Sequence, residues 1–400
     1  MKVLPIFIFG GSQTIGWMKA GFDVDKVLEM TDDMIENNSY HFSKNYTNIE
    51  IVPPSIWNNK SYLESLTGYD VFCGNPPCSG LSQINRNAKA DSHTNDHIYD
   101  FINIVMTVKP KIFFFENAPT LVKLGLPILK TIQNIVKDDY KMTVITDLAG
   151  NHSVPMERRR TLTIGWRKDI FPRIPKIDSN TQPKMTLGEA LKGLTDKTPN
   201  MELDKGIYEW DKNLFQYYYL APNYHQTIGK TLIRQDIFDK VKDTFSESQL
   251  KYYTRLKEKY EKQNGGIWDK SAIRLSNDEW APSMTSLSKF IHPTENRDFY
   301  VREYARLMGY PDDFIFYQNE CKCPAVQCLA QGVPVNFIKY IADEIKLCLE
   351  NDRGLYDCDL VYINQASGKQ KIIEFTADQF QHSLQIDKND VQLYHEVGLW

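Results

Sequence analysis

The chain has 400 residues, of which 42% are hydrophobic and 24% charged, a composition typical of a globular protein with a large core. No apolar run approaches the roughly 18 residues that a membrane-spanning helix needs, and no signal-peptide pattern opens the chain, so we expect a cytoplasmic protein without a membrane partner. Seven cysteines, an odd number spread along the chain, argue against a disulfide framework and indicate free thiols.

The net charge of −4 does not suggest a nucleic-acid binder, because phosphate binding normally needs a basic face. The charge is uneven, however. Residues 230–274 carry 11 Lys and Arg against 7 Asp and Glu. This excess permits a basic cleft, although a solvated helix face explains it equally well.

Residues 1–170 alternate short apolar runs with amphipathic stretches, which is typical of βαβ units around a mostly parallel sheet. The run at 112–115 is Ile-Phe-Phe-Phe without polar alternation, as expected for a strand covered on both faces. The predicted fold class is therefore α/β with a doubly wound, Rossmann-like sheet. The expected strands are 4–9, 26–30, 69–73, 112–115, 143–147 and 161–166.

The pattern changes after this half. Residues 175–298, with the tyrosines 217–219, predict a smaller irregular domain inserted into the first, which spans 1–174. One helix is expected from Ser246, where Ser246 and Gln249 match a capping box, to the glycines 265–266. Residues 299–350, with helices at 301–308 and 335–350, are expected to complete the first domain. Residues 351–400 are expected to form a tail with a β-hairpin made of 359–363 and 371–375.

A glycine-bearing turn follows the first expected strand. Gly10, Gly11 and Ser12 connect this strand to a helix, the usual place for a nucleotide-like cofactor. Glu29 closes the second strand, 18 residues beyond Gly11, about where an acidic residue binds ribose hydroxyls. A strand-to-helix turn without a ligand explains the glycines equally well.

The strongest local signal is the segment 74–80 (GNPPCSG), directly after the strand 69–73. Ligands of open α/β sheets bind beyond the carboxyl ends of the strands, which is where Cys78 falls. The two prolines restrict the backbone, so the segment can present a thiol rigidly. A buried core cysteine is the competing interpretation, and it suits Cys73 better than Cys78.

Two further motifs supply polar groups. Glu116 comes directly after the strand 112–115, where partial burial would raise its pKa toward that of a general acid. Its carboxylate could instead favour the dipole of a following helix. Arg158 and Arg160 alternate before the strand 161–166 and so could reach one site together, although a solvated basic turn fits them too.

A thiolate and a protonatable carboxyl suit one reaction in particular. Carbon 5 of cytosine becomes nucleophilic only after a soft nucleophile adds to carbon 6, and a proton donor at ring N3 absorbs the charge that this addition creates. Cys78 and Glu116 fit these two tasks.

Taken in order, these motifs resemble the DNA cytosine C5 methyltransferase family. The Pro-Pro-Cys segment 76–78 is similar to its nucleophile loop, residues 116–118 to its Glu-Asn-Val motif, and Arg158 with Arg160 to its Arg-x-Arg motif. Residues 302–312 and 330–335 match the two motifs that follow its target-recognition domain. The likeness covers residues 3–348.

The resemblance implies a role for each motif. Cys78 would attack a flipped-out cytosine, Glu116 would hold N3, and Arg160 and Arg158 would hold the base and the active loop. The loop 79–98 would close over double-stranded DNA, read by residues 175–298 of a monomer. S-adenosyl-L-methionine (AdoMet) would lie against a set of residues from several motifs, namely Phe7, Gly10, Gly11, Ser12, Glu29, Met30, Pro77 and Gln331.

Some positions depart from the family pattern. Ser12 replaces a glycine and Gln331 an asparagine, which leaves open a modified AdoMet as donor. An RNA cytosine methyltransferase and a catalytically silent DNA-binding relative remain alternatives. A zinc site at Cys321, Cys323 and Cys328 is a weaker one, since the sequence offers no fourth ligand nearby, and we predict no metal.

Overall fold

The computed structural model describes residues 1–77, 79–81, 89–201, 273–286, 288, 290–295, 297–317 and 320–383, together with short pieces between 223 and 258. Cys78 lies outside the described residues, as do the tyrosines 217–219, Gln249 and the glycines 265–266. The described pieces between 247 and 258 are helical, in agreement with the helix expected there.

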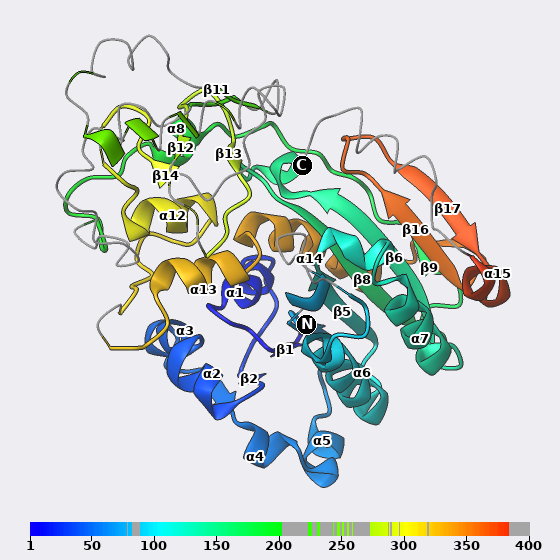
Figure 1. Cartoon of the computed structure of the whole chain (residues 1–400). Coiled ribbons are helices and arrows are strands. Elements are labelled where there is room, and N and C mark those ends of the chain that lie inside the picture. Colours follow the sequence, from blue (N-terminus) through cyan, green and yellow to red (C-terminus); the bar gives the residue numbers. More distant parts are fainter. Residues whose placement is uncertain are drawn as a thin grey trace.

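A large mixed sheet forms the centre of the molecule, and it confirms the predicted α/β fold class (Figure 1). In the described part of the chain its order is β17-β16-β6-β8-β5-β4-β1-β2-β3. All six strands expected from the sequence are present, with ends shifted by a few residues. The strands are β1 (Val3–Ile6), β2 (Lys26–Leu28), β3 (Glu50–Val52), β4 (Val71–Gly74), β5 (Ile112–Asn117), β6 (Tyr140–Leu148), β8 (Arg159–Arg167), β16 (Leu360–Asn364) and β17 (Lys371–Phe375).

The first five strands pair in parallel, as expected, whereas β8 runs antiparallel to both of its neighbours, β5 and β6. The connection from Leu148 to Arg159 explains this reversal. A crossover to a parallel strand needs a dozen or more residues and usually a helix, and this connection is too short for one.

Helices cover both faces of the sheet. Side chains alternate along β5, so that Ile112 and Phe114 pack into one core cluster and Phe113 and Phe115 into the other. The first cluster includes residues of α1 (Ser12–Lys19) and α14 (Val335–Glu350), and the second includes residues of α6 (Asp96–Val108) and α7 (Leu126–Val136). Because α6 begins at Asp96, it takes in the end of the segment expected as a loop.

Helix α14 confirms the helix expected at 335–350 and lies beside α1 (Figure 1). A Cβ at Gly16 would come within 2.6 Å of the Ile338 side chain, so the two helices approach too closely for any other residue at position 16. The other helices are α2 (Asp32–Asn37), α3 (Tyr40–Asn45), α4 (Pro54–Trp57), α5 (Lys60–Ser65), α8 (Leu187–Leu191), α12 (Val301–Leu307), α13 (Ala325–Gln331) and α15 (Ala377–His382).

The expected C-terminal hairpin is present, and it packs against the first domain. Strand β16 pairs in parallel with β6, and β17 pairs with β16, so the two strands extend the sheet (Figure 1). Gln365, just after β16, donates from Nε2 to Asp147 Oδ2 at 2.6 Å and to Tyr340 Oη at 3.0 Å. The hairpin is therefore tied to β6 and to α14.

A second, smaller sheet has the order β11-β10-β12-β14 and lies in the region expected to be an irregular domain. Two short pairings connect distant parts of the chain: β13 (Ala281–Pro282) pairs with β7 (Met156–Glu157), and β15 (Gly354–Tyr356) pairs with β9 (Ile174–Pro175). In the part of the chain that is described, no helix is long and apolar enough to cross a membrane. The strands of the small sheet are β10 (Asn223–His225), β11 (Lys230–Leu232), β12 (Ile273–Arg274) and β14 (Phe290–Ile291).

Candidate active site

The turn between β1 and α1 is held in an unusual backbone conformation. Phe7 and Phe9 have positive φ angles of 61° and 50°, and Gly11 has a φ of 85°. A Cβ at Gly11 would lie 2.1 Å from the Phe42 ring, and one at Gly10 would lie 3.0 Å from Tyr310 Oη. Packing and backbone conformation within the protein therefore require a glycine at position 11, whereas a side chain at position 10 would crowd the Tyr310 hydroxyl.

Glu29 follows β2 and lies next to this turn. Its side chain is fully buried, and Oε2 accepts a hydrogen bond of 3.0 Å from the Ile8 amide. Oε1 is buried without a hydrogen-bond partner in the described part of the chain. Burial raises the pKa of the Glu29 carboxyl to about 8, against the opposing effects of the Ile8 amide, the Ser39 hydroxyl and the Phe9 amide. A buried acceptor of this kind can bind a ligand hydroxyl.

Apolar side chains flank Glu29. Phe7 is fully buried and Met30 is partly buried in the same cluster, together with Trp57. The Trp57 indole donates from Nε1 to the Glu29 carbonyl oxygen at 2.7 Å, and its ring centroid lies 6.4 Å from that of Phe7. The structure thus places two predicted cofactor residues, Phe7 and Met30, beside the third, Glu29.

Two of the residues that depart from the family pattern form hydrogen bonds with other parts of the protein. They are Ser12 and Gln331. Ser12 Oγ accepts a hydrogen bond from the Val333 amide at 3.1 Å. The exposed Gln331 accepts at Oε1 from Asn38 Nδ2, at 2.7 Å. Ser12 therefore fixes the turn after β1 to the segment that precedes α14.

The backbone leading to Cys78 is anchored at three successive positions. Gln13 Nε2 donates to the Gly74 carbonyl at 3.2 Å, and Asn75 Nδ2 donates to the Gln331 carbonyl at 3.4 Å. Asn117 Nδ2 donates to the Pro76 carbonyl at 3.3 Å. Pro77, a predicted cofactor residue, is half-buried in this loop. No role was expected for Gln13, Asn75 or Asn117, because their positions inside or beside motifs were the only signal in the sequence.

The structure brings Glu116 and Arg160 together. Glu116 lies at the end of β5 and is 3% exposed, and Arg160 Nε lies 2.5 Å from its Oε1. Burial raises the pKa of the Glu116 carboxyl, while the charges of Arg160 and Arg158 oppose the rise. The Asn117 contact with Pro76 connects this carboxyl to the loop that carries Cys78.

Arg158 is buried and bonds to backbone in two other segments. Its Nη1 donates to the Met284 carbonyl at 2.9 Å, and its Nη2 donates to the carbonyls of Ala330 and Gly332, both at 2.7 Å. The guanidinium therefore joins the start of β8 to the region after β13 and to the end of α13. These three partners are backbone carbonyls, and the positive charge of Arg158 acts to lower the pKa of the Glu116 carboxyl.

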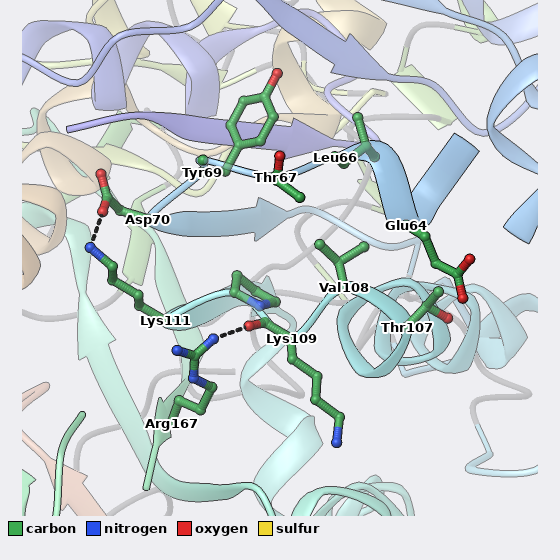
Figure 2. A pocket seen from close by; sticks show the side chains of 12 residues that line it. Glu64, Leu66, Thr67, Tyr69, Asp70, Thr107, Val108, Lys109, Lys111 and Arg167 are labelled. Carbon is green, nitrogen blue, oxygen red and sulfur yellow. Dashed lines mark hydrogen bonds and ion pairs between the residues drawn. The ribbon is translucent and has the colours of Figure 1, made fainter. Parts of the chain in front are cut away.

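A cavity of about 350 Å³ lies away from these residues (Figure 2). Its lining residues lie at the amino ends of the parallel central strands, and the candidate site lies at their carboxyl ends. Asp70 and Lys111 directly precede β4 and β5 there. Lys111 Nζ lies 2.7 Å from Asp70 Oδ1, and Arg167 donates to the Lys109 carbonyl. These charges are already engaged, and the cavity is not part of the candidate site.

No group of three or more His, Cys, Asp or Glu side chains is placed to hold a metal ion among the residues that the structure describes. The zinc alternative at Cys321, Cys323 and Cys328 finds no support there.

The sheet order, the turn after β1 and the buried Glu29 after β2 define the class of AdoMet-dependent α/β methyltransferases. A prophage-encoded E. coli protein assigned as a DNA modification methyltransferase shares this fold, with a TM-score of 0.60 and 20% identity over 88% of this chain and all of that one. The chain belongs to the C-5 cytosine-specific DNA methylase family, whose model matches residues 1–347. The resemblance inferred from the motifs is thereby confirmed, and the enzyme is a DNA cytosine-5-methyltransferase of a family that uses AdoMet as methyl donor.

Two curated relatives extend this likeness over most of the chain. The type II methyltransferase M.MthTI of Methanothermobacter thermautotrophicus is 26% identical over 365 residues, which is 88% of this chain and 98% of the relative. The type II methyltransferase M.DdeI of Desulfomicrobium norvegicum is 24% identical over 397 residues, or 90% and 92% of the two chains.

Proposed function

We propose that this enzyme methylates C5 of cytosine in double-stranded DNA through a covalent bond between Cys78 and carbon 6 of a flipped-out base. The observation that carries the proposal is the buried Glu116 carboxyl beside Arg160, connected through Asn117 to the Pro76 backbone two residues before Cys78. A duplex buries cytosine in its base stack, so the base has to leave the stack to reach such a site.

Each side chain has a distinct task in this mechanism. The Cys78 thiolate adds to carbon 6, which places negative charge on the ring and makes carbon 5 nucleophilic. The raised pKa of Glu116 favours its protonated form, which donates to ring N3 and stabilises that charge. Arg160 orients the Glu116 carboxyl and would contact the base carbonyl. Arg158 is a positioning residue, because its guanidinium bonds three backbone carbonyls.

The residues around the β1 turn fit AdoMet. Glu29 Oε1, which has no hydrogen-bond partner among the described residues, would accept from its ribose hydroxyls, and Phe7 and Met30 would contact its adenine. Gly10, Gly11, Ser12, Pro77 and Gln331 would border the rest of the site. When bound there, AdoMet supplies the methyl group that carbon 5 takes.

The division of labour along the chain is also a proposal. Residues 1–174 and 299–350 form the catalytic domain, and 175–298 form the recognition domain of a monomer that binds the duplex between them. The small second sheet and the excess of basic residues at 230–274 support this division. The type II names of the curated relatives support a place in a restriction-modification system.

Transfer of tritium from labelled AdoMet tests this function. We expect incorporation into duplex DNA, little into single-stranded DNA or tRNA, and none with Cys78→Ala. Bisulfite sequencing of the duplex should then place the methyl group on cytosine C5. Preferential labelling of tRNA would replace the proposed substrate with RNA, and AdoMet binding without any transfer would indicate a silent relative.

A further inference from the structure

Two thiols beside the cofactor turn are in direct contact. Cys323 lies just before α13, and Cys328 lies within that helix. Their Sγ atoms are 3.1 Å apart, with Cys328 donating and Cys323 accepting. Cys328 is fully buried and Cys323 is 7% exposed. The proposed methyl-transfer mechanism uses neither of them.

The contact is suited to covalent chemistry between the two sulfurs. A disulfide bond is about 2.0 Å long, so closing it requires the two sulfurs to approach each other by about 1 Å. The hydrogen bond from Cys328 lowers the pKa of the Cys323 thiol, and the thiolate is the form that attacks a disulfide. The partial exposure of Cys323 gives a small oxidant access to the attacking sulfur.

The third cysteine of this segment is engaged differently. Cys321 Sγ lies 3.5 Å from His41 Nε2 and donates to the Cys323 carbonyl oxygen at 3.2 Å. His41 comes from α3, far away in the sequence. Cys321 therefore serves as a neighbouring thiol that should not take part in the pair.

We propose that Cys323 and Cys328 form a reversible dithiol–disulfide pair that responds to small disulfides of the glutathione class. The Cys323 thiolate attacks one sulfur of the oxidant and releases one small thiolate, leaving a mixed disulfide on Cys323. Cys328 then attacks the Cys323 sulfur and releases the second small thiolate, which takes up the Cys328 proton. Two protein thiols are oxidised to one disulfide, and one small disulfide is reduced to two thiols.

The position of the pair couples this modification to the AdoMet site. A Cβ at Gly10 would lie 3.4 Å from Cys328 Cβ, so Cys328 packs directly against the turn between β1 and α1. Helix α13 ends at Gln331, whose carbonyl accepts from Asn75, and Arg158 holds the carbonyls of Ala330 and Gly332. Pulling Cys328 toward Cys323 shifts α13 against these contacts, and weaker AdoMet binding is the consequence.

Peptide mass spectrometry tests the pair directly. The full-length enzyme is incubated with oxidised glutathione, alkylated and digested with trypsin. Cleavage after Lys322 and Lys339 leaves Cys323 and Cys328 in one peptide, while Cys321 falls in the preceding peptide and Cys78 in another. The peptide 323–339 should be two hydrogens lighter than the reduced form and carry no alkyl group. It should regain both alkylation sites after treatment with dithiothreitol.

Variants separate the roles of the three thiols. Cys328→Ala should stop at a stable mixed disulfide on Cys323, whereas the matched control Cys321→Ser should still give the lighter peptide. Alkylation of both cysteines in the oxidised wild type, or a cross-link to the Cys321 peptide, would overturn the proposal. Stoichiometric zinc bound to these thiols in the untreated protein would overturn it as well.

Calorimetry with AdoMet tests the coupling. Oxidation of the wild type should weaken AdoMet binding several-fold, with recovery on reduction, whereas Cys323→Ser should bind equally before and after the oxidant. Since Cys323→Ser keeps Cys78, it controls for oxidation there. Equal affinities of the oxidised and reduced wild type would show that the disulfide does not act on the cofactor turn.

Discussion

Glu29 combines complete burial with one oxygen that has no partner among the described residues. An ionised carboxylate in such a place is costly, which is why the pKa of Glu29 rises to about 8. A ligand that donates to Oε1 favours the ionised form and therefore lowers this pKa. Binding of AdoMet is thus expected to release a proton near neutral pH.

Replacing Glu29 by Gln should remove two pH dependences at once. Because the folded-state pKa is raised, the contribution of Glu29 to stability is fully present below its unfolded pKa and is lost as pH rises toward about 8. Urea denaturation of the ligand-free wild type should therefore include a decline of up to about 1.4 kcal/mol per pH unit over this window, absent in Glu29→Gln.

The same variant should bind AdoMet about tenfold or more weakly, since the amide cannot accept as strongly as a carboxylate. For the wild type, calorimetry should show affinity rising with pH up to about 8, together with proton release that depends on the buffer. Unchanged affinity in Glu29→Gln would remove Glu29 from the cofactor site.

Glu116→Gln tests the proton donor. Gln keeps the size of the side chain but cannot carry the exchangeable acid proton, so kcat should fall by about 10²–10⁴. AdoMet affinity should stay the same, because Glu116 lies on β5 and its ion pair is with Arg160. Single-turnover kinetics combined with calorimetry separates the two effects. A variant that retains full kcat would exclude Glu116 as the donor at N3.

Among single residues, the sequence identified the charged side chains of the candidate site. It missed the side chains that donate hydrogen bonds to backbone carbonyls. Glu116 was singled out because it follows an apolar strand, and Arg160 because it precedes one. The donors Gln13, Asn75 and Asn117 reach carbonyls that only the folded sheet edge brings near them. The carbonyl partners of Arg158 likewise lie more than 100 residues away in sequence.

Among the elements, the end of α13, the start of β8 and the region after β13 meet at the Arg158 guanidinium. Arg158→Met would leave three carbonyls without this donor in a buried place. We expect a loss of about 3–5 kcal/mol in the free energy of unfolding. The exposed Arg173 offers a matched control, and Arg173→Met should stay within about 0.5 kcal/mol of the wild type. Equal stability of the two variants would contradict the role given to Arg158.

Besides the pairing of β16 with β6, one buried amide attaches the C-terminal hairpin to β6 and α14. Gln365→Leu would remove the donor to Asp147 and Tyr340 while nearly preserving volume, at a cost of about 1–3 kcal/mol. Lys369→Met in the exposed turn is the control and should be neutral. Chemical denaturation of both variants measures the difference. A neutral Gln365→Leu would show that strand pairing alone holds the hairpin.

Element prediction was accurate where hydrophobic patterning is strong. The continuous apolar run of β5 and the amphipathic α14 were located from sequence alone. The direction of β8 and the docking of β16 against β6 could not be predicted, because periodicity identifies a strand without specifying its neighbour.

On the scale of the whole molecule, sequence far beyond the first domain completes its core. Helix α14 packs against α1, and β16 pairs with β6, so residues after 330 close a fold that begins at Val3. The regular patterning of residues 299–350 predicted the return of the chain to the first domain. The sequence also predicted the C-terminal hairpin, but not that its two strands, which lie beyond the matched residues 1–347, extend the sheet.

Covalent trapping is the sharpest test of the proposed bond between Cys78 and the cytosine ring. A duplex that carries 5-fluorocytosine at the methylation site is incubated with the enzyme and AdoMet, and the digest is analysed by mass spectrometry. Fluorine cannot leave carbon 5 as a proton does. We therefore expect a stable adduct on the peptide that contains Cys78, and none with Cys78→Ala. A folded, DNA-binding enzyme that forms no adduct, or forms one at another cysteine, would contradict it.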